Sequence, residues 1–330
     1  MSRPNQTSTR CCRSFDRCTG NSLLQLPASC AATQAIVDRQ LALWPEHESF
    51  LTKSFAERDA PAMQITEDTA AKIAVLAGER LGEYCAGYRW MCEAMLEEEL
   101  FFRRHGRYRA QRFADVAEAI YDDPDTMRKY MNGLLLSQVF WRNHVDIAGF
   151  YRSFVSSLPN GFDHLEIGPG HGLQLAYAAS DPKCHSATGW DISEASLEAT
   201  RECLRRLDAP DSVRLERRDV LELAADSATY TSVVVSEVLE HLEDPAAALA
   251  GVRRILHERG LAFMNVPCNS PAPDHIHLFS EPEEFFAMVE QAGFTIVRRC
   301  ATPVTGATLE RARRQKLTIS CAVIVSSGRR

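Results

Sequence analysis

The 330-residue sequence has no apolar run that approaches the roughly 20 residues of a membrane-spanning helix. Its first residues contain no apolar h-region of a secretory signal peptide. It also lacks an excess of positive charge, because 37 Lys and Arg stand against 44 Asp and Glu, for a formal net charge of −7. This balance argues against a phosphate backbone as the main partner. We therefore expect no membrane span, no nucleic-acid partner and a cytoplasmic protein.

The eleven cysteines are odd in number and follow no zinc-binding spacing. Four of them, Cys11, Cys12, Cys18 and Cys30, lie in a stretch rich in Arg and Ser and poor in acidic residues. We interpret residues 1–30 as a disordered leader, with an organellar transit peptide as the alternative. Scattered cysteines of this kind favour a reducing compartment over a disulfide framework.

The sequence changes in character near residue 157. From 31 to 157 apolar residues recur at spacings of three and four, which is typical of helices. "YDDPD", at residues 121–125, is a helix start signal with Pro124 among acidic residues. From 158 to 330 short apolar segments alternate with helical patterns, which predicts an α/β domain with a largely parallel sheet. The strands are predicted within "DHLEIG", "SATGWD", "VRLERRDV", "YTSVVVS", "GLAFMNV", "FTIVRRC" and "KLTISCAVIVSS".

A glycine-rich loop, "GPGHG", directly follows the first predicted strand. Gly170 and Gly172 are two residues apart, whereas the dinucleotide pattern G-x-G-x-x-G places its second and third glycines three apart. The loop and the preceding Glu166 therefore suit a cationic amino-acid ligand better than a diphosphate. This spacing disfavours a nicotinamide oxidoreductase. Asp191 and Asp219 end the next two strands, where we expect them to accept hydrogen bonds from ribose hydroxyls and an adenine amine, respectively.

Together these motifs make residues 161 to about 327 resemble a class I S-adenosyl-L-methionine-dependent methyltransferase, on the segments "LEIGPGHG", "GWDIS", "RRDV" and "VVVSEVLEHLEDP". The resemblance implies a Rossmann-like seven-stranded sheet with an antiparallel final hairpin. It implies that the cofactor methionine lies over Glu166 and Gly168. Pro169 departs from the family loop and removes one backbone donor. The candidate cofactor-binding residues are Glu166, Gly168, Gly170, Gly172, Asp191, Ile192, Asp219, Val220 and Ser236.

The segment "EVLEH" raises the possibility of a metal site. If a helix begins near Glu237, then Glu237, Glu240 and His241 share one face. With His275 or His277 from the loop "DHIH", they form a ligand set for Mg²⁺, Mn²⁺ or Zn²⁺. The pattern is similar to small-RNA 2′-O-methyltransferases and to ubiquinone-pathway O-methyltransferases. In the metal-free alternative the glutamates cap the helix or contact substrate, and His241, His275 or His277 acts as general base.

We interpret residues 31–157 as an α-helical lid or dimerisation domain that selects substrate, and residues 158–330 as the catalytic domain. Trp141, His144 and Tyr151 are the candidate substrate contacts, with core packing as the alternative role of each. The favoured function is methyl transfer to a small-molecule acceptor, at a hydroxyl oxygen, in secondary or cofactor metabolism. A metal-dependent RNA 2′-O-methyltransferase and a non-catalytic S-adenosyl-L-methionine-binding protein are the alternatives.

Overall fold

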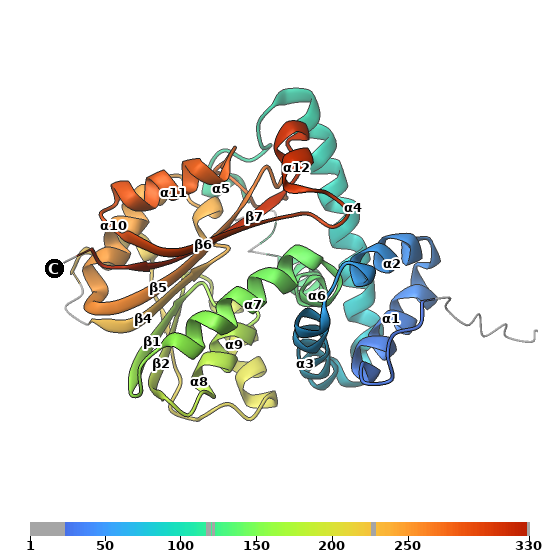
Figure 1. Cartoon of the computed structure of the whole chain (residues 1–330), viewed down its shortest axis with the longest axis horizontal. Helices are drawn as coiled ribbons and strands as arrows, with labels where there is room; N and C mark the ends of the chain where they lie inside the picture. Colours follow the sequence, from blue (N-terminus) through green and yellow to red (C-terminus); the bar gives the residue numbers. More distant parts are fainter. Residues whose placement is uncertain (1–23, 117–119, 121–122, 226–228, 329–330) are drawn as a thin grey trace, which may run out of the picture.

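The computed structural model describes residues 24–116, 120, 123–225 and 229–328. A seven-stranded sheet with the order β3-β2-β1-β4-β5-β7-β6 forms its centre (Figure 1). Only β7 runs antiparallel to its neighbours β5 and β6. The predicted fold class and the antiparallel final hairpin are therefore confirmed. The strands are β1 (Phe162–Ile167), β2 (Cys184–Asp191), β3 (Arg214–Arg217), β4 (Tyr230–Ser236), β5 (Leu256–Cys268), β6 (Thr295–Pro303) and β7 (Ile319–Ser326).

Helices cover both faces of the sheet (Figure 1). One face carries α7 (Arg142–Ser157), α8 (Leu173–Ala179) and α9 (Glu194–Arg206). The other carries α10 (Pro245–Ile255) and α11 (Pro282–Gln291), while the short α12 (Leu309–Gln315) precedes β7. Because both faces are covered, successive residues of the central strands are buried rather than alternating with exposed ones, as in Val233–Val235 of β4.

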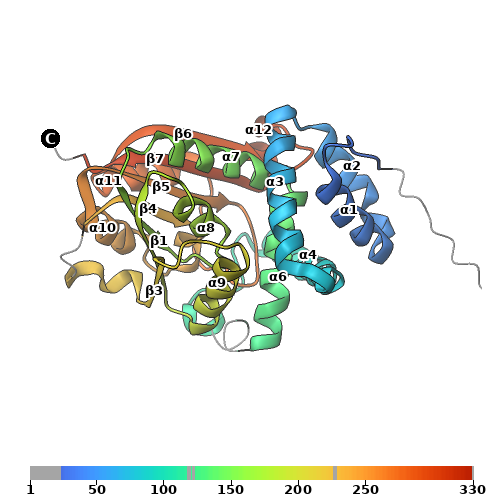
Figure 2. The same ribbon diagram turned by 90° about the horizontal axis from the view of Figure 1, so that it is seen from below.

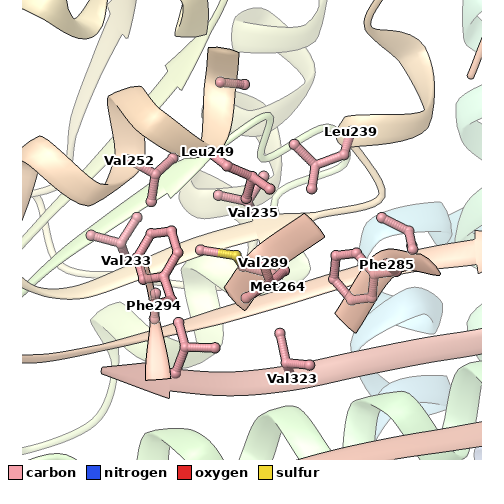
Figure 3. Packing of buried hydrophobic residues seen from close by; sticks show 14 of the residues in the cluster. Val233, Val235, Leu239, Leu249, Val252, Met264, Phe285, Val289, Phe294 and Val323 are labelled. Atoms are coloured by element: carbon pink, nitrogen blue, oxygen red, sulfur yellow. The ribbon is translucent and has the colours of Figure 1, made fainter. Parts of the chain in front are cut away.

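The packing on the α10–α11 face shows that alternate residues of β4 enter different hydrophobic clusters (Figure 3). Val233 and Val235 of β4 point into a cluster with Leu249 and Val252 of α10. The intervening Val234 lies in a separate cluster with residues of α7. The side-chain period of two along a strand thus places successive valines in two different cores.

The N-terminal helices form a separate cluster beside the sheet (Figures 1 and 2). The α-helices are α1 (Ala31–Leu43), α2 (Glu48–Ala56), α3 (Ala60–Ala77), α4 (Leu81–His105), α5 (Phe113–Val116) and α6 (Pro124–Phe140). Short 3₁₀ turns at Pro45–His47 and Gly78–Arg80 precede α2 and α4. The predicted start signal is confirmed, because Asp123 caps α6 through the backbone N–H of Asp125 and Pro124 begins the helix.

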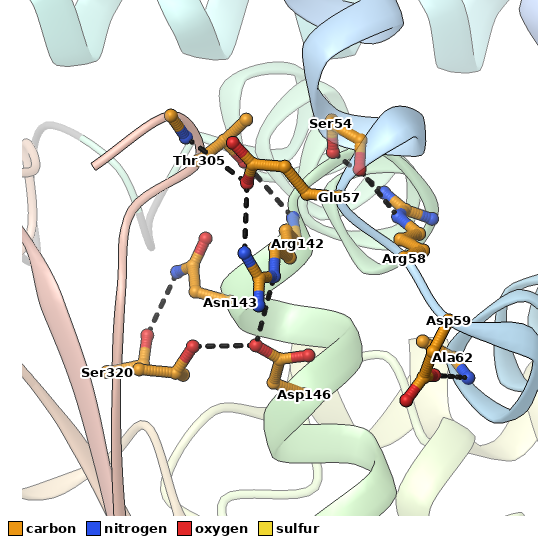
Figure 4. Close-up of polar contacts among 12 residues, drawn as sticks. Ser54, Glu57, Arg58, Asp59, Ala62, Arg142, Asn143, Asp146, Thr305 and Ser320 are labelled. Atoms are coloured by element: carbon orange, nitrogen blue, oxygen red, sulfur yellow. Dashed lines mark hydrogen bonds and ion pairs between the residues drawn. The ribbon is translucent and has the colours of Figure 1, made fainter. Parts of the chain in front are cut away.

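Helix α7 joins this cluster to the sheet (Figure 4). Arg142 at its first turn forms an ion pair of 3.1 Å with Glu57 at the end of α2. The neighbouring Asn143 donates a 2.9 Å hydrogen bond to Ser320 Oγ on β7. The backbone N–H of Arg142 donates to Thr305 Oγ1, in the connection from β6 to α12. The helical cluster is therefore held against the antiparallel hairpin by specific polar contacts.

Part of the predicted leader belongs to the helical cluster. Leu24 and Leu26 pack against it, and Cys30 is buried before the first residue of α1. Cys11, Cys12 and Cys18 lie outside the described residues. Over the described ranges, no helix combines the length and apolar character needed to span a membrane.

Candidate active site

One large cavity lies where the carboxyl ends of the parallel strands meet the N-terminal helices. Its volume is ≈ 1570 Å³, and it borders residues of the tips of β1, β2, β4 and β5 as well as of α4, α6 and α7. Typical small-molecule pockets measure roughly 300–1,000 Å³. The cavity therefore has room for two ligands side by side. Its position is the one at which parallel α/β sheets bind ligands.

The glycine-rich loop forms one wall through its unusual backbone. Gly168 and Gly170 have φ angles of 68° and 53°, in the region that glycine adopts without strain. A Cβ on Gly168 would lie 2.6 Å from Val238 Cγ2, so no larger residue fits there. Gly172 differs from the prediction: it does not border the cavity but packs against Thr200 of α9. It is a glycine for helix packing rather than for ligand contact.

Glu166 at the end of β1 is a buried carboxylate that borders the cavity. Its Oε2 has no hydrogen-bond partner in the structure, and burial raises the pKa of this carboxyl well above its usual range. An unpaired buried carboxylate is costly without a cationic partner. The site therefore fits the ammonium group of an amino-acid ligand such as the methionine part of S-adenosyl-L-methionine.

Two further acids border the same cavity at the next strand tips. Asp191 accepts hydrogen bonds from the Ser193 backbone at 2.9 Å and the Ser196 hydroxyl at 2.6 Å. Burial raises the pKa of Asp191 despite these two bonds. Asp219 accepts from the Leu221 backbone at 2.8 Å. Each carboxylate is oriented by its own turn. The remaining predicted cofactor contacts that border the cavity are Gly168, Gly170, Ile192, Val220 and Ser236.

The "EVLEH" segment is not the start of a helix, and that prediction was wrong. Glu237 has a φ of 52°, and Leu239–His241 forms a single 3₁₀ turn. Helix α10 begins only at Pro245, where Asp244 caps the Ala247 backbone. The segment bends because the Glu240 carbonyl accepts hydrogen bonds from Ile276 and His277 of the loop after β5. Its side chains therefore do not follow the i, i+3, i+4 pattern of one helical face.

The bent segment nevertheless brings three predicted metal ligands together. Glu240, His241 and His275 each offer one potential ligand atom, and these three atoms lie within 4.8 Å of one another. His241 Nδ1 donates to the Asp274 carbonyl at 2.9 Å, and His275 Nδ1 donates to the Ser270 carbonyl at 2.6 Å. Because a carbonyl only accepts, each Nδ1 carries a proton, and Nε2 is the ring nitrogen that could bind a metal. Histidines that ligate metals are usually held in this way.

Glu240 completes this cluster as a fully buried carboxyl group whose side chain interacts with that of Glu237. Burial and the nearby Glu237 raise the pKa of its carboxyl well above the usual range. Burial also lowers the pKa of His275 to about 4, which keeps the imidazole neutral. Two imidazole nitrogens and a buried carboxyl group fit a divalent cation of the first transition row. Glu237 is not one of the three clustered ligands; its side chain accepts a hydrogen bond from Asn265 and also interacts with Glu240.

His277 does not face the cavity, in contrast to the prediction. Its ring packs on Phe279 with centroids 4.6 Å apart, and burial lowers the pKa of the imidazole. The backbone bonds from Ile276 and His277 to the Glu240 carbonyl orient the loop so that His275, not His277, enters the site.

Of the three predicted substrate contacts, all within or next to α7, two border the cavity and one does not. Trp141 and His144 border the cavity. Tyr151 does not: it is buried in the core between α7 and the sheet, and its hydroxyl donates to the Gln174 carbonyl at 2.9 Å. His47, Phe50 and the other helical residues at the cavity were not predicted. Their apolar spacing is that of any core helix, so the sequence contains no signal for them.

Comparison with known proteins shows what part of the chain is similar to. Residues 165–264 match the methyltransferase domain family. An uncharacterized 37.1 kDa protein in a transposon of Streptomyces fradiae is 32% identical over 108 residues, which cover 32% of this chain and 30% of that protein. Ubiquinone biosynthesis O-methyltransferase of Nitrosomonas europaea is 28% identical over 108 residues, 32% of this chain and 44% of that enzyme. The chain thus spans less than half the length of these relatives.

Among solved structures, the N-methyltransferase NodS of Bradyrhizobium japonicum is similar over 56% of this chain and 96% of its own. The TM-score is 0.45 and the sequence identity 16%.

Proposed function

We propose that this chain, which contains an S-adenosyl-L-methionine-dependent methyltransferase domain over residues 165–264, methylates a hydroxyl oxygen of a small-molecule acceptor. The observation that supports methyl-donor binding most directly is the unpaired, buried Glu166 carboxylate beside the glycine-rich loop. We assign residues 158–330 to catalysis and residues 31–157 to substrate selection, because α4, α6 and α7 close the cavity over the strand ends.

The charge of the cavity wall favours a small molecule over RNA. Among the described residues that border it, the only Lys or Arg side chains are Arg217 and Arg218, beside Asp219. The acidic residues of the same wall are Glu99, Glu166, Asp191, Glu194, Asp219, Glu237, Glu243, Asp244 and Asp274. A site for an RNA end would require cations near the reacting hydroxyl. The RNA 2′-O-methyltransferase alternative is therefore disfavoured.

Each polar group of the site then has a role in binding or proton transfer. Glu166 binds the ammonium of the methionine moiety, and Asp191 binds the ribose hydroxyls. His241 and His275 border the cavity and are held through Nδ1, which makes them the candidates to take the proton of an acceptor hydroxyl. The helices above the strand tips exclude water, which would otherwise compete for the methyl group.

We assign a divalent cation to Glu240, His241 and His275. When bound, S-adenosyl-L-methionine supplies an electrophilic methyl group, and the cation favours the deprotonated form of an acceptor hydroxyl. In its absence His241 or His275 alone serves as the base. His277 is no longer a candidate for either role, because it faces Phe279.

Titration calorimetry with S-adenosylhomocysteine tests the proposal. After EDTA treatment the protein should bind this product. Asp191→Asn should weaken binding about tenfold, because the variant loses one or two hydrogen bonds to a charged acceptor. Mn²⁺ or Zn²⁺ should bind to the wild type and to Glu243→Gln, but not to Glu240→Gln. Glu243 is the matched control, because it is an acid three residues away that binds the Phe113 backbone.

Three outcomes are distinguishable. Absence of product binding contradicts the methyltransferase proposal itself. Product binding without a Glu240-dependent metal signal leaves the histidines as bases and contradicts the metal assignment. Product binding without transfer of labelled methyl to any phenol, alcohol or amine in a broad panel supports a non-catalytic binding protein instead.

A further inference from the structure

His164 is a histidine in the interior of the sheet, two residues before Glu166 on β1. Its side chain is fully buried. Because side chains on a strand alternate between two faces, His164 and Glu166 lie on the same face of β1. β1 is an interior strand, flanked by β2 and β4. The histidine therefore lies in the core, just below the strand tip that borders the cavity.

The surroundings of His164 would suit an apolar residue. The ring of Phe162, the preceding residue on the same face, has its centroid 6.2 Å from that of the His164 ring. Phe162 and Val234 of β4 belong to the apolar cluster that includes residues of α7. Burial lowers the pKa of His164 to about 3, which keeps the imidazole neutral. A polar ring in this position costs free energy unless its nitrogens find partners.

One ring nitrogen of His164 has a partner. Nδ1 lies 2.9 Å from Oγ of Ser232, the residue opposite it on β4. Ser232 is also fully buried, and among the described residues its hydroxyl has no other hydrogen-bond partner. If Nδ1 were the donor, the hydroxyl proton would lack an acceptor in the core. The Ser232 hydroxyl therefore donates to Nδ1, and the ring proton resides on Nε2.

The other ring nitrogen faces Glu166. Nε2 lies 3.9 Å from Oε2 of Glu166, which is longer than a hydrogen bond. Both atoms are buried and lack a hydrogen-bond partner in the structure. An ionised carboxylate only accepts, whereas Nε2 carries a proton, so the two atoms are complementary. Because Glu166 borders the cavity, this pair connects the core of the sheet to the ligand site.

We propose that His164 is a positioning residue, which holds the Glu166 carboxylate toward the ammonium group of S-adenosyl-L-methionine. The inference rests on the proposed function. The ammonium binds an ionised carboxylate, and a small side-chain shift then closes the 3.9 Å gap into a charge-assisted hydrogen bond from Nε2–H to Oε2. A chain of hydrogen bonds thus runs from the Ser232 hydroxyl through His164 and Glu166 to the ligand.

Two ligands that differ by one group isolate this role. S-adenosylhomocysteine carries the ammonium group, and 5′-S-(3-carboxypropyl)-5′-thioadenosine, the deamino ligand, is the same molecule without it. The wild type should bind S-adenosylhomocysteine at least tenfold more tightly, because a hydrogen bond to a charged group has about this value. Titration calorimetry gives both affinities, and their ratio is the quantity that His164 should control. A general loss of stability would lower both affinities together.

Substitutions of His164 separate its donor atom from its packing. His164→Leu should weaken S-adenosylhomocysteine at least tenfold and the deamino ligand less than twofold. His164→Gln and His164→Asn form a matched pair, because both introduce an amide but only the longer glutamine brings its nitrogen near the position of Nε2. Glutamine should restore most of the affinity for S-adenosylhomocysteine, and asparagine should not. Phe162→Leu disturbs the same face of β1 and should leave the ratio of the two affinities within twofold of the wild type.

Two further variants test the neighbours of His164 in the chain of hydrogen bonds. In the Glu166→Gln background, His164→Leu should change the affinity for S-adenosylhomocysteine less than twofold, because no carboxylate remains to be positioned. Ser232→Ala should weaken S-adenosylhomocysteine selectively, because Nδ1 loses its donor. This variant decides the question if His164→Leu does not fold.

Equal weakening of both ligands by His164→Leu, or by Ser232→Ala in its place, overturns the inference. Equal recovery with glutamine and asparagine also overturns it, as does a His164→Leu effect that persists in Glu166→Gln. Equal affinity of the wild type for the two ligands overturns it as well, since Glu166 then does not bind the ammonium. Only absence of S-adenosylhomocysteine binding by the wild type contradicts the proposed function itself.

Discussion

The hydroxyl of Tyr130 on α6 donates a 2.6 Å hydrogen bond to Oδ1 of Asp274, in the loop after β5, and both side chains are buried. The Asp274 carbonyl in turn accepts from His241 Nδ1. Asp274 thus joins α6 to the histidine site. A change in the position of α6 is therefore transmitted to His241 through a short chain of polar contacts.

Tyr130→Phe should lower the free energy of unfolding by about 1–3 kcal/mol, because it removes the 2.6 Å hydrogen bond that the hydroxyl donates to a buried carboxylate. Thr126→Ala on the same helix removes an exposed hydrogen bond to Asp123 and should cost less. Urea denaturation of the two variants measures the difference. Equal losses would show that the buried bond has no special weight.

Gly168→Ala should destabilise the protein and abolish S-adenosylhomocysteine binding. Its Cβ would meet Val238 at 2.6 Å in addition to the strain of a φ of 68°. Gly106 is the matched control, since its φ is 69° and no heavy atom lies within 4 Å of an added Cβ. Gly106→Ala should therefore cost only the backbone strain, about 1–2 kcal/mol. Calorimetry and thermal denaturation check both parts, and retained ligand affinity in Gly168→Ala would contradict the assigned role of the loop.

Glu240→Met should stabilise the metal-free protein by about 1–3 kcal/mol, because an apolar side chain of similar size removes a fully buried carboxyl group that lies beside the second buried acid Glu237. The same variant should lose any rise in Tm that Mn²⁺ or Zn²⁺ causes in the wild type. Unfolding measured with EDTA and with metal gives both values. Destabilisation of the metal-free form would mean that the interaction of Glu240 with Glu237 outweighs the cost of burying the carboxyl group.

The stability of the protein should fall as pH decreases below about 6.5, the unperturbed value of histidine. Burial lowers the pKa of His47 to about 4, so the folded form stays neutral while the unfolded chain takes up a proton. The stabilising contribution is present above 6.5 and is lost as pH falls toward 4. Urea denaturation between pH 7.5 and 5 should show a shallower pH dependence for His47→Gln than for the wild type. His185→Gln, at an exposed position on β2, should leave the slope unchanged.

Much of the fold, and of the side of the cavity formed by the glycine-rich loop, was predictable from local sequence. The seven strands, the start of α6 and the positions of Glu166, Asp191 and Asp219 at strand tips follow from hydrophobic period, turn residues and the rule that parallel strands collect their carboxyl ends at one edge. These features depend on residues close together in the chain.

The side of the cavity that contains His241 and His275 was decided only by the tertiary structure. "EVLEH" has the spacing of a helix face, yet the loop around Asp274 binds the Glu240 carbonyl and forces a 3₁₀ turn. The same contact turns His275 into the site and His277 away from it. Likewise Trp141 and Tyr151 both lie in the "WRNHVDIAGFY" stretch, but docking against β7 brings only Trp141 to the cavity. Contacts between segments that are distant in the chain set these orientations, and a pattern of single residues does not contain them.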